Sequence, residues 1–461
     1  MRRAALSGAV AAVLVASLAG TAQAETFSPG SPGLADPFFP LAGNGGYDVS
    51  HYDLDVRYRP GSHMATATTR VSANATQGLS RFDLDFLGPR ITRLTVDGIE
   101  ARFTRDGQEL IITPPSPIDD GTAFEVVVAY EGRLKPVRDP DGSRDGWVPT
   151  RTGAHVVSEP IGSPSWYPCN DYPTDKATFR TSITVPRGRK AFGNGLLVER
   201  TRTDNAVTFV WEMNDPMATY LATATNGRFK RLQRARIAGL PAYLGVAPSE
   251  LADSRKPLRK LRKIPGYFEP VFGPYPFESI GAVVDDTNKV GFALETQTLP
   301  VYQHAPPGLT VAHETAHQWF GNSVSIEQWP EIWLNEGFAT WSEWFWQQQT
   351  GQRTLERTFR HFYGIPADDK EIWEPPPANL TKPKHLFGES VYVRGGLTLE
   401  ALRQEIGQPA FFEFLRRWAS EHAYGNANTD DLIALAEEVS GRQLDEFFDV
   451  WLFQRGKPKN W

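Results

Sequence analysis

The sequence contains 461 residues, of which 40% are hydrophobic and 22% are charged, and its formal net charge is −6 at pH 7. This length and balance are typical of a folded protein with two or three domains, and the acidic charge excludes the basic footprint of a nucleic-acid-binding protein. The single cysteine, Cys169, excludes an internal disulfide. The fold must therefore be stabilised by its core, to which a bound metal would add.

The first 24 residues have the pattern of a secretory signal. Two arginines near the start precede an apolar run over residues 9–19, and Ala-Gln-Ala at residues 22–24 provides small residues for cleavage. No later segment approaches the roughly 20 consecutive apolar residues needed to cross a bilayer. We therefore expect a secreted, extracellular protein without a membrane span.

The next part of the chain has the periodicity of β-strands. Residues 25–46 are rich in Pro, Gly and Ser and are expected to form an extended leader. Across residues 47–228, short segments such as YDVSHYDLDVRY and AFEVVVAYEG alternate polar and apolar positions and are separated by Gly, Pro and Asp turns. Period-two alternation is typical of half-buried strands. The sequence therefore predicts an N-terminal all-β domain over residues 47–228.

Helical spacing becomes dominant in residues 229–461. Two further strands are predicted around PAYLGVAP and SIGAVVDD, with a helix from about 249 to 268 between them. After residue 309, apolar residues recur at intervals of three and four, which predicts helices over about 334–348 and 389–406 and several more in the tail. We expect an α+β domain, so the whole chain is a multi-domain protein.

One stretch of the α+β domain carries metal-binding chemistry. His313 and His317 are four residues apart, which places both imidazoles on one face of a helix. Glu336 follows after enough residues for a second helix to begin. Two histidines and one glutamate make a three-ligand zinc set with an open fourth position. Glu314, between the histidines, is predicted to be the general base.

A purely structural role is the alternative interpretation of these residues. A histidine pair on a helix is more often an ordinary surface or core pair. Here the neighbouring residues Val311, Ala312 and Ala316 are apolar, so the histidines are expected to be buried and to need polar partners, which a metal ion supplies. Glu343, one heptad after Glu336, could orient a ligand histidine, or could make an ordinary hydrogen bond; the sequence leaves both open.

The stretches HETAHQWFGN at 313–322 and WLNEGFA at 333–339 resemble the aminopeptidase N family, a group of zinc metallopeptidases called gluzincins. The resemblance extends along most of the chain. It implies a saddle-like N-terminal β domain followed by a thermolysin-like catalytic domain. It also implies one catalytic Zn2+ per chain, held by His313, His317 and Glu336.

The resemblance also implies roles for residues outside the metal motif. FALETQTLPVY at 292–302 corresponds to the family's Gly-x-Met-Glu-Asn element and places Glu295 on the free α-amino group of the substrate. VSEPIGSPSWYPCNDYPTDKATF at 157–179 similarly places Glu159 as a second carboxylate on that ammonium. SVYVRGG at 390–396 resembles the family's Tyr-x-Lys-Gly element, so Tyr392 would donate to the developing oxyanion.

Three positions depart from the family pattern. Phe292 and Thr296 replace the glycine and asparagine around Glu295, and Arg394 replaces the lysine after Tyr392. Because the glutamate is kept, these changes bear on substrate preference more than on activity. The sequence also ends where the family's catalytic domain would finish, so we expect a short form without the C-terminal helical domain.

These observations imply a secreted zinc aminopeptidase, which we expect to act as a monomer on peptide substrates with a free N-terminus. Three alternatives stay open at the level of sequence. The first is a zinc endopeptidase with a cleft open at both ends, and the second is a hydrolase of a non-peptide substrate such as an epoxide. The third is a non-catalytic binding module that keeps zinc for stability, although a structural site needs neither Glu314 nor Tyr392.

Overall fold

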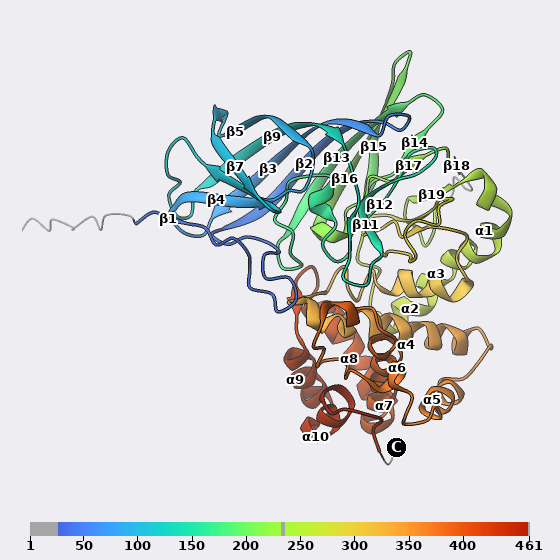
Figure 1. Cartoon of the computed structure of the whole chain (residues 1–461). Helices are drawn as coiled ribbons and strands as arrows, with labels where there is room; N and C mark the ends of the chain where they lie inside the picture. The colour runs from blue at the N-terminus through green and yellow to red at the C-terminus, as the bar shows by residue number, and fades with distance from the viewer. Residues whose placement is uncertain (1–25, 232–235, 460–461) are drawn as a thin grey trace, which may run out of the picture.

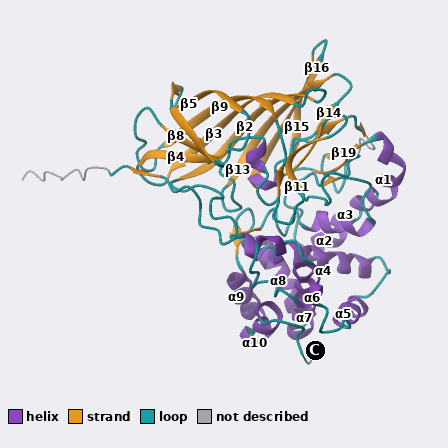
Figure 2. Cartoon of the chain, viewed as in Figure 1, coloured by secondary structure: helices purple, strands orange, loops and turns teal. Residues whose placement is uncertain are grey.

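The structure, a computed structural model of the whole chain, describes residues 26–231 and 236–459. The predicted signal segment, residues 1–24, lies outside the described residues. Figure 1 shows two parts, a β-rich N-terminal part and a largely helical C-terminal part that meet along one junction. Figure 2 shows the same division, with strands filling one end of the molecule and helices the other.

A mixed eight-stranded sheet forms the N-terminal part, in the order β15-β16-β13-β2-β3-β9-β5-β6. Its strands alternate between buried and exposed residues, as in β2, because one face covers the core and the other faces solvent. Only the neighbours β2 and β13 run parallel within this sheet. The strands span β2 (Tyr47–Arg59), β3 (Met64–Ala75), β5 (Arg90–Val96), β6 (Ile99–Glu100), β9 (Ala123–Arg133), β13 (Lys176–Pro186), β15 (Leu196–Arg202) and β16 (Ala206–Ala218).

Two smaller sheets pack against this sheet through aromatic side chains. The first has the order β1-β4-β8-β7, and the ring of Phe82 on β4 lies 5.1 Å from that of Phe124 on β9. The second has the order β10-β11-β12-β17-β14, and Trp147 on β11 meets Tyr58 on β2 edge-on at 4.9 Å. Such ring pairs add to the apolar area that they bury. The strands span β1 (Ser28–Pro29), β4 (Leu79–Asp85), β7 (Arg102–Asp106), β8 (Glu109–Thr113), β10 (Val137–Arg138), β11 (Arg144–Pro149), β12 (Ala154–Val157), β14 (Lys190–Ala191) and β17 (Asn226–Gly227).

The segment predicted as an extended leader is fixed to the body of the protein. After β1, the buried Asp36 accepts the backbone N–H of Trp329 at 2.9 Å, and Phe39 packs edge-on against the same tryptophan at 6.2 Å. Trp329 belongs to the C-terminal part. The leader therefore helps to hold the two parts together.

The C-terminal part begins with a four-stranded sheet, in the order β18-β19-β20-β21. The single helix predicted over about 249–268 is wrong. The region contains α1 (Leu251–Leu258) and α2 (Ile264–Phe272), separated by a 3-10 turn. Pro257 and Pro265 each lack a backbone N–H, so a continuous helix would lose hydrogen bonds here. The strands span β18 (Lys230–Arg231), β19 (Ala242–Val246), β20 (Ile280–Val284) and β21 (Val301–Tyr302).

The remaining helices form a bundle around α4. Gly337 on α4 and Gly395 on α7 let these two helices cross closely, because a Cβ atom added to Gly337 would meet the backbone of Gly395 at 3.0 Å. Within the described residues, no helix has the length and apolar composition needed to cross a membrane. The elements span α3 (Gly308–Ala316), α4 (Trp333–Gln349), α5 (Leu355–Tyr363), α6 (Lys370–Trp373), α7 (Gly395–Ile406), α8 (Gln408–Glu421), α9 (Thr429–Ser440) and α10 (Asp445–Phe448), with a two-stranded sheet of β22 (Ser325–Ile326) and β23 (Asn426–Ala427).

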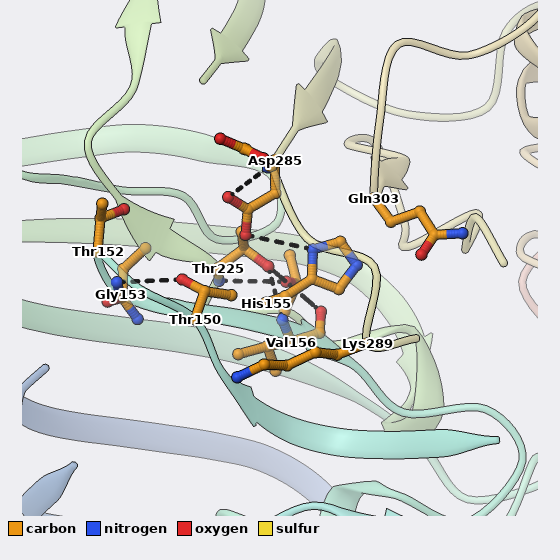
Figure 3. Close-up of polar contacts among 12 residues, drawn as sticks. Thr150, Thr152, Gly153, His155, Val156, Thr225, Asp285, Lys289 and Gln303 are labelled. Carbon is orange, nitrogen blue, oxygen red and sulfur yellow. Dashed lines mark hydrogen bonds and ion pairs between the residues drawn. The ribbon is translucent and has the colours of Figure 1, made fainter. Parts of the chain in front are cut away.

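Buried polar contacts join the two parts. Figure 3 shows His155 of β12 facing Asp285, which follows β20; the imidazole Nδ1 lies 3.5 Å from the carboxylate Oδ2. At another point of the junction, the ammonium of Lys176 on β13 donates to the carbonyls of Asn322, Ser323 and Gly425 at 3.1, 2.9 and 2.6 Å. Burial lowers the pKa of Lys176 to about 7, while these three carbonyls favour its protonated form. The change of sheet at the junction occurs between Gly227, in β17, and Lys230, in β18.

Candidate metal centre and active site

Two neighbouring helices of the bundle, α3 and α4, bring the predicted metal ligands together. The sequence placed both histidines within one helix, whereas α3 ends at Ala316 and His317 forms its C-cap. The helical spacing is kept, because the backbone N–H of His317 still donates to the carbonyl of His313 at 3.2 Å. Glu336 lies in the first turn of α4 and faces both imidazoles.

The donor atoms of these three residues converge on one point. The Nε2 atom of His313 lies 3.0 Å from Oε2 of Glu336, and Nε2 of His317 lies 3.4 Å from the same oxygen. All three donor atoms are within 4.8 Å of one another, and all three residues are buried. Two imidazole nitrogens and one carboxylate oxygen are the donor set that Zn2+ prefers in catalytic sites, and a fourth position faces a cavity. The residues therefore fit a zinc ion.

The outer nitrogens of the two imidazoles also have partners. Nδ1 of His313 lies 2.8 Å from Oε1 of Glu343, and Nδ1 of His317 lies 3.0 Å from the carbonyl oxygen of Phe320. These contacts leave both Nε2 atoms for the metal, because a ligand histidine donates its other N–H to a carboxylate or carbonyl. Glu343 thus lies where an orienting carboxylate is required.

The pKa values of this cluster show how strongly the carboxylates act on the imidazoles. In the metal-free protein, burial opposes the charged form of both histidines, but hydrogen bonds to Glu336 and Glu343 raise the pKa of His313 well above its ordinary value. The carboxylates of Glu295 and Glu336 raise the pKa of His317 to about 9. A metal that binds here therefore competes with protons that both imidazoles hold more tightly than an ordinary histidine does.

Glu314 lies on α3 between the two histidines and lines the same cavity. Burial raises its pKa to about 8 in the metal-free protein, although the two imidazoles lower it in part. A divalent cation beside Glu314 would favour its ionised form. The carboxyl group is therefore placed to exchange a proton near neutral pH, as a general base must.

Two further glutamates lie beside the centre, Glu159 from the N-terminal part and Glu295 from the C-terminal part. Glu159 follows β12 and Glu295 follows β20, and carboxylate oxygens of both lie within 4.8 Å of one another and of Glu336. Glu159 Oε1 and Glu295 Oε1 are buried and have no hydrogen-bond partner among the described residues. Burial raises the pKa of both groups, and the charge of Glu295 raises that of Glu159 further. Oε1 of Glu295 also lies 3.8 Å from Nδ1 of His317. Two buried carboxylates this close to each other favour a cation between them.

Sequence reasoning missed the residues that position Glu295. Gln318 and Asn322 both donate to the backbone carbonyl of Glu295, at 3.1 and 2.8 Å. The side-chain oxygen of Gln318 also accepts the N–H of Thr298 at 2.7 Å. Both residues lie in the stretch HETAHQWFGN, where a polar side chain among buried aromatic residues is the signal that could have identified them.

Tyr392 reaches the cavity from a short π-helix over Ser390–Arg394. Its ring is nearly parallel to the His313 imidazole, with 6.0 Å between centroids and 21° between planes. π-helical turns are frequent at functional sites. Burial and the surrounding carboxylates raise the pKa of Tyr392 well above its ordinary value, so its hydroxyl keeps its proton and can donate it in a hydrogen bond.

Arg394, which departs from the family pattern, anchors this π-helix. Its guanidinium is wholly buried and donates to four backbone carbonyls, of Trp373, Val450, Trp451 and Gln454, at 2.6–3.1 Å. A planar guanidinium offers five donors, whereas a lysine offers three from one nitrogen. Arg394 therefore ties the segment that carries Tyr392 to the end of the chain.

These groups line one cavity of about 620 Å³. Its walls include apolar side chains such as Phe292, Trp344 and Phe387, whereas no lysine or arginine is among the described residues that line it. Eight lining residues are carboxylic acids: Asp139, Asp141, Glu159, Glu295, Glu314, Glu336, Glu343 and Glu389. The cavity is large enough for a small peptide segment, and its carboxylates favour a positively charged ligand.

The chain matches two descriptions of one peptidase family. "Peptidase M1 N-terminal domain" matches residues 49–221, and "Peptidase family M1 domain" matches residues 275–451. Among curated proteins, aminopeptidase A of Gloydius brevicauda is 25% identical over 88% of this chain and 46% of its own length. Aminopeptidase M1-B of Oryza sativa subsp. japonica is 26% identical over 89% of this chain and 50% of its own length. The chain thus spans about half the length of these relatives.

Solved structures are similar over nearly the full length of both chains. An M1 zinc metallopeptidase from Deinococcus radiodurans is 29% identical, with a TM-score of 0.84, and the match covers 93% of this chain and 99% of that one. A mutant of that enzyme bound to a Tyr-Ser-Ala substrate matches with a TM-score of 0.85 and 28% identity, over 93% and 99% of the two chains. These similarities confirm the predicted fold class, an all-β domain followed by an α+β metallopeptidase domain.

Proposed function

Since this chain belongs to peptidase family M1, we propose that it is a zinc-dependent aminopeptidase that releases the first residue of peptides with a free N-terminus. One observation carries the proposal: two buried carboxylates, Glu159 and Glu295, lie beside the His313, His317 and Glu336 set, and each has an oxygen without a hydrogen-bond partner among the described residues. A zinc ligand set alone supports many hydrolases. A cation-binding pair next to it supports a substrate whose charged α-amino group lies one residue from the bond that is cut.

The chemistry proposed for the site divides among its residues. A zinc ion held by His313, His317 and Glu336 would polarise the scissile carbonyl and acidify a water molecule. Glu314 would take the proton of the attacking water and pass it to the leaving amine. The Tyr392 hydroxyl would donate to the oxyanion of the tetrahedral intermediate, where charge develops.

The two carboxylates supply the direction of cleavage. The ammonium of the substrate would be held between Glu159 and Glu295, which stabilises their ionised forms. Gln318 and Asn322 would keep Glu295 in position through its backbone carbonyl. This arrangement supports removal of a single residue, because the charged N-terminus is held next to the metal centre. An acetylated N-terminus has no charge and would not be held in this way.

The charge of the cavity supports a preference for a cationic first residue. The hairpin between β10 and β11 places Asp139 and Asp141 on the cavity wall. Oδ2 of Asp139 accepts the Ser143 hydroxyl at 2.9 Å, whereas its buried Oδ1 has no partner among the described residues. Burial raises the pKa of Asp139 to about 7. An arginine or lysine side chain would supply the missing partner and the compensating charge.

The proposal is tested with aminoacyl anilides and a purified protein carrying one equivalent of zinc. We expect hydrolysis that a chelator abolishes and added zinc restores. The variant Glu314→Gln should keep stoichiometric zinc but lose turnover by roughly 10²- to 10⁴-fold, because it removes the base and leaves the ligands intact. Turnover at the wild-type rate in the zinc-loaded variant would reject the role of Glu314.

Export after removal of the first 24 residues and a monomeric state belong to the same proposal and rest on the sequence alone. Zinc endopeptidase activity is the second candidate function. The feature that favours it is the size of the acidic cavity, about 620 Å³, whose lining also includes Asp141 and Glu389.

A further inference from the structure

A second cavity, of about 630 Å³, lies at the junction of the two parts of the protein. It is lined from one side by β14, β15 and β16 and from the other by β18 and β19, on the right of Figure 1. It shares no lining residue with the cavity at the metal centre. Its volume is in the range of small-molecule sites, roughly 300–1,000 Å³.

The charges of this cavity are all positive. Lys190, Arg200, Arg202 and Arg231 line it, and none of the described lining residues is a carboxylic acid. This composition contrasts with that of the whole chain, whose net charge is −6. Among the described residues, Lys190, Arg200 and Arg202 form no ion pair with a carboxylate. These three charges therefore lack an internal counterion among the described residues.

The same cations act on one another. Burial lowers the pKa of Lys190, and the charges of Arg200, Arg231 and Lys230 lower it further. Like charges held together in this way repel, so an anion that enters between them is attracted by all of them at once. A compact anion with several charges gains most from this arrangement.

Aromatic side chains form the floor of the cavity, and contacts with neighbouring residues hold them in place. Trp211 on β16 meets Tyr243 on β19 edge-on at 4.8 Å, and the hydroxyl of Tyr243 accepts the backbone N–H of Leu197 at 3.1 Å. The guanidinium of Arg200 lies over the ring of Phe209 at 5.4 Å, which fixes its direction. The cavity thus places cations, one of them oriented by a ring, beside an apolar surface.

We propose that this cavity binds an organic phosphate, that is, a phosphate or diphosphate group attached to an aromatic or apolar body. Guanidinium groups match the oxygens of phosphate with paired hydrogen bonds, and the ammonium of Lys190 adds a further charge. The aromatic floor contacts the body of the ligand. Two sources share this chemistry: a soluble nucleotide-like molecule and the headgroup of an anionic phospholipid.

An extended acidic peptide fits these observations less well. Its carboxylates are singly charged and spread along the chain, whereas Arg200 and Arg231 both act on Lys190 within one cavity. A phosphate carries close to two charges on one centre and therefore interacts with all of these groups together.

Calorimetric titration of the zinc-loaded full chain tests the proposal, with inorganic pyrophosphate, adenosine diphosphate and vesicles of phosphatidylglycerol as probes. The test variant is Arg200→Gln/Arg202→Gln, and its matched control is Arg93→Gln/Arg102→Gln. The control removes the same charge from exposed arginines of β5 and β7, on the opposite side of the β-rich part. Hydrolysis of anilides should be unchanged in both variants, since neither touches the metal centre.

We expect adenosine diphosphate to bind more tightly than pyrophosphate, because only the former contacts the aromatic floor. Binding should weaken by at least about tenfold in the test variant, remain at the wild-type level in the control, and fall as salt is added. Binding to vesicles but not to adenosine diphosphate would identify the lipid headgroup as the source. Failure of all three probes to bind at low salt, or equal weakening in test and control variants, would overturn the proposal.

Lys190→Gln gives an independent readout if the double variant loses stability. It changes one residue of β14 and leaves the Arg200–Phe209 contact in place. Weaker binding of adenosine diphosphate in Lys190→Gln, with an unchanged melting temperature, supports the proposal. Unchanged binding in this variant contradicts it.

Discussion

Removal of the Glu343 carboxylate should weaken zinc binding without removing any zinc ligand. Oε1 of Glu343 lies 2.8 Å from Nδ1 of His313, and the Glu343 side chain is only 23% exposed. A hydrogen bond between charged groups contributes about 1.5–3 kcal/mol. Orienting partners of this kind change metal affinity by roughly 10- to 100-fold, or about 1.4–2.7 kcal/mol. We therefore expect Glu343→Ala to raise the dissociation constant for zinc by this factor.

The assay is competition for zinc against a chelator of known affinity, followed for three variants. Glu343→Gln keeps an oxygen that can accept the Nδ1–H, so its loss should be several-fold smaller than that of Glu343→Ala. Glu389→Ala is the control, because it removes a carboxylate from the same cavity without a contact to His313. Zinc affinity equal to wild type in Glu343→Ala, or an equal loss in Glu389→Ala, would refute the assignment.

Three further predictions concern the same site. Tyr392→Phe should lower kcat by roughly 10²-fold with little change in KM, because the hydrogen bond of Tyr392 forms in the transition state. Steady-state kinetics with anilides measures both constants. An unchanged kcat would show that Tyr392 does not stabilise the oxyanion. The pKa values of both ligand histidines are raised, that of His317 to about 9, so zinc must displace a proton from each. Zinc affinity should therefore rise by up to about two log units per pH unit between pH 7 and 8. Calorimetry in buffers of different ionisation enthalpy should count about two released protons, and a flat profile above pH 7 would contradict the raised pKa values. Asp139→Asn should reduce kcat/KM for arginine anilide about fivefold relative to leucine anilide, the size of one partly screened charge pair; an equal effect on both substrates would argue against the cationic preference.

Local spacing explains why much of the centre could be predicted from the sequence. The interval between His313 and His317 places both imidazoles on one side of a helical turn, and this holds even though α3 ends at Ala316. The seven-residue interval between Glu336 and Glu343 likewise places both side chains on one side of α4. Such relations depend on a few consecutive residues, so the sequence contains them.

Long-range contacts explain what could not be predicted. Lys176 binds carbonyls that lie 146 to 249 residues away along the chain, and Arg394 binds carbonyls up to 60 residues away. No periodicity signals such contacts, because they depend on how the two parts of the protein pack together. The break between α1 and α2 is different. Pro257 and Pro265 are visible in the sequence, and giving them more weight would have predicted two helices.

The most direct test of the account is product mapping on one peptide in two forms. A decapeptide with arginine in first position is incubated with the zinc-loaded protein, either with a free N-terminus or acetylated, and the products are identified by mass spectrometry. Because Glu159 and Glu295 are proposed to hold the α-ammonium, the account predicts that single residues are released in order from the free peptide and that the acetylated peptide remains intact. Internal cleavage of the acetylated peptide at a rate comparable to that of the free form would contradict it.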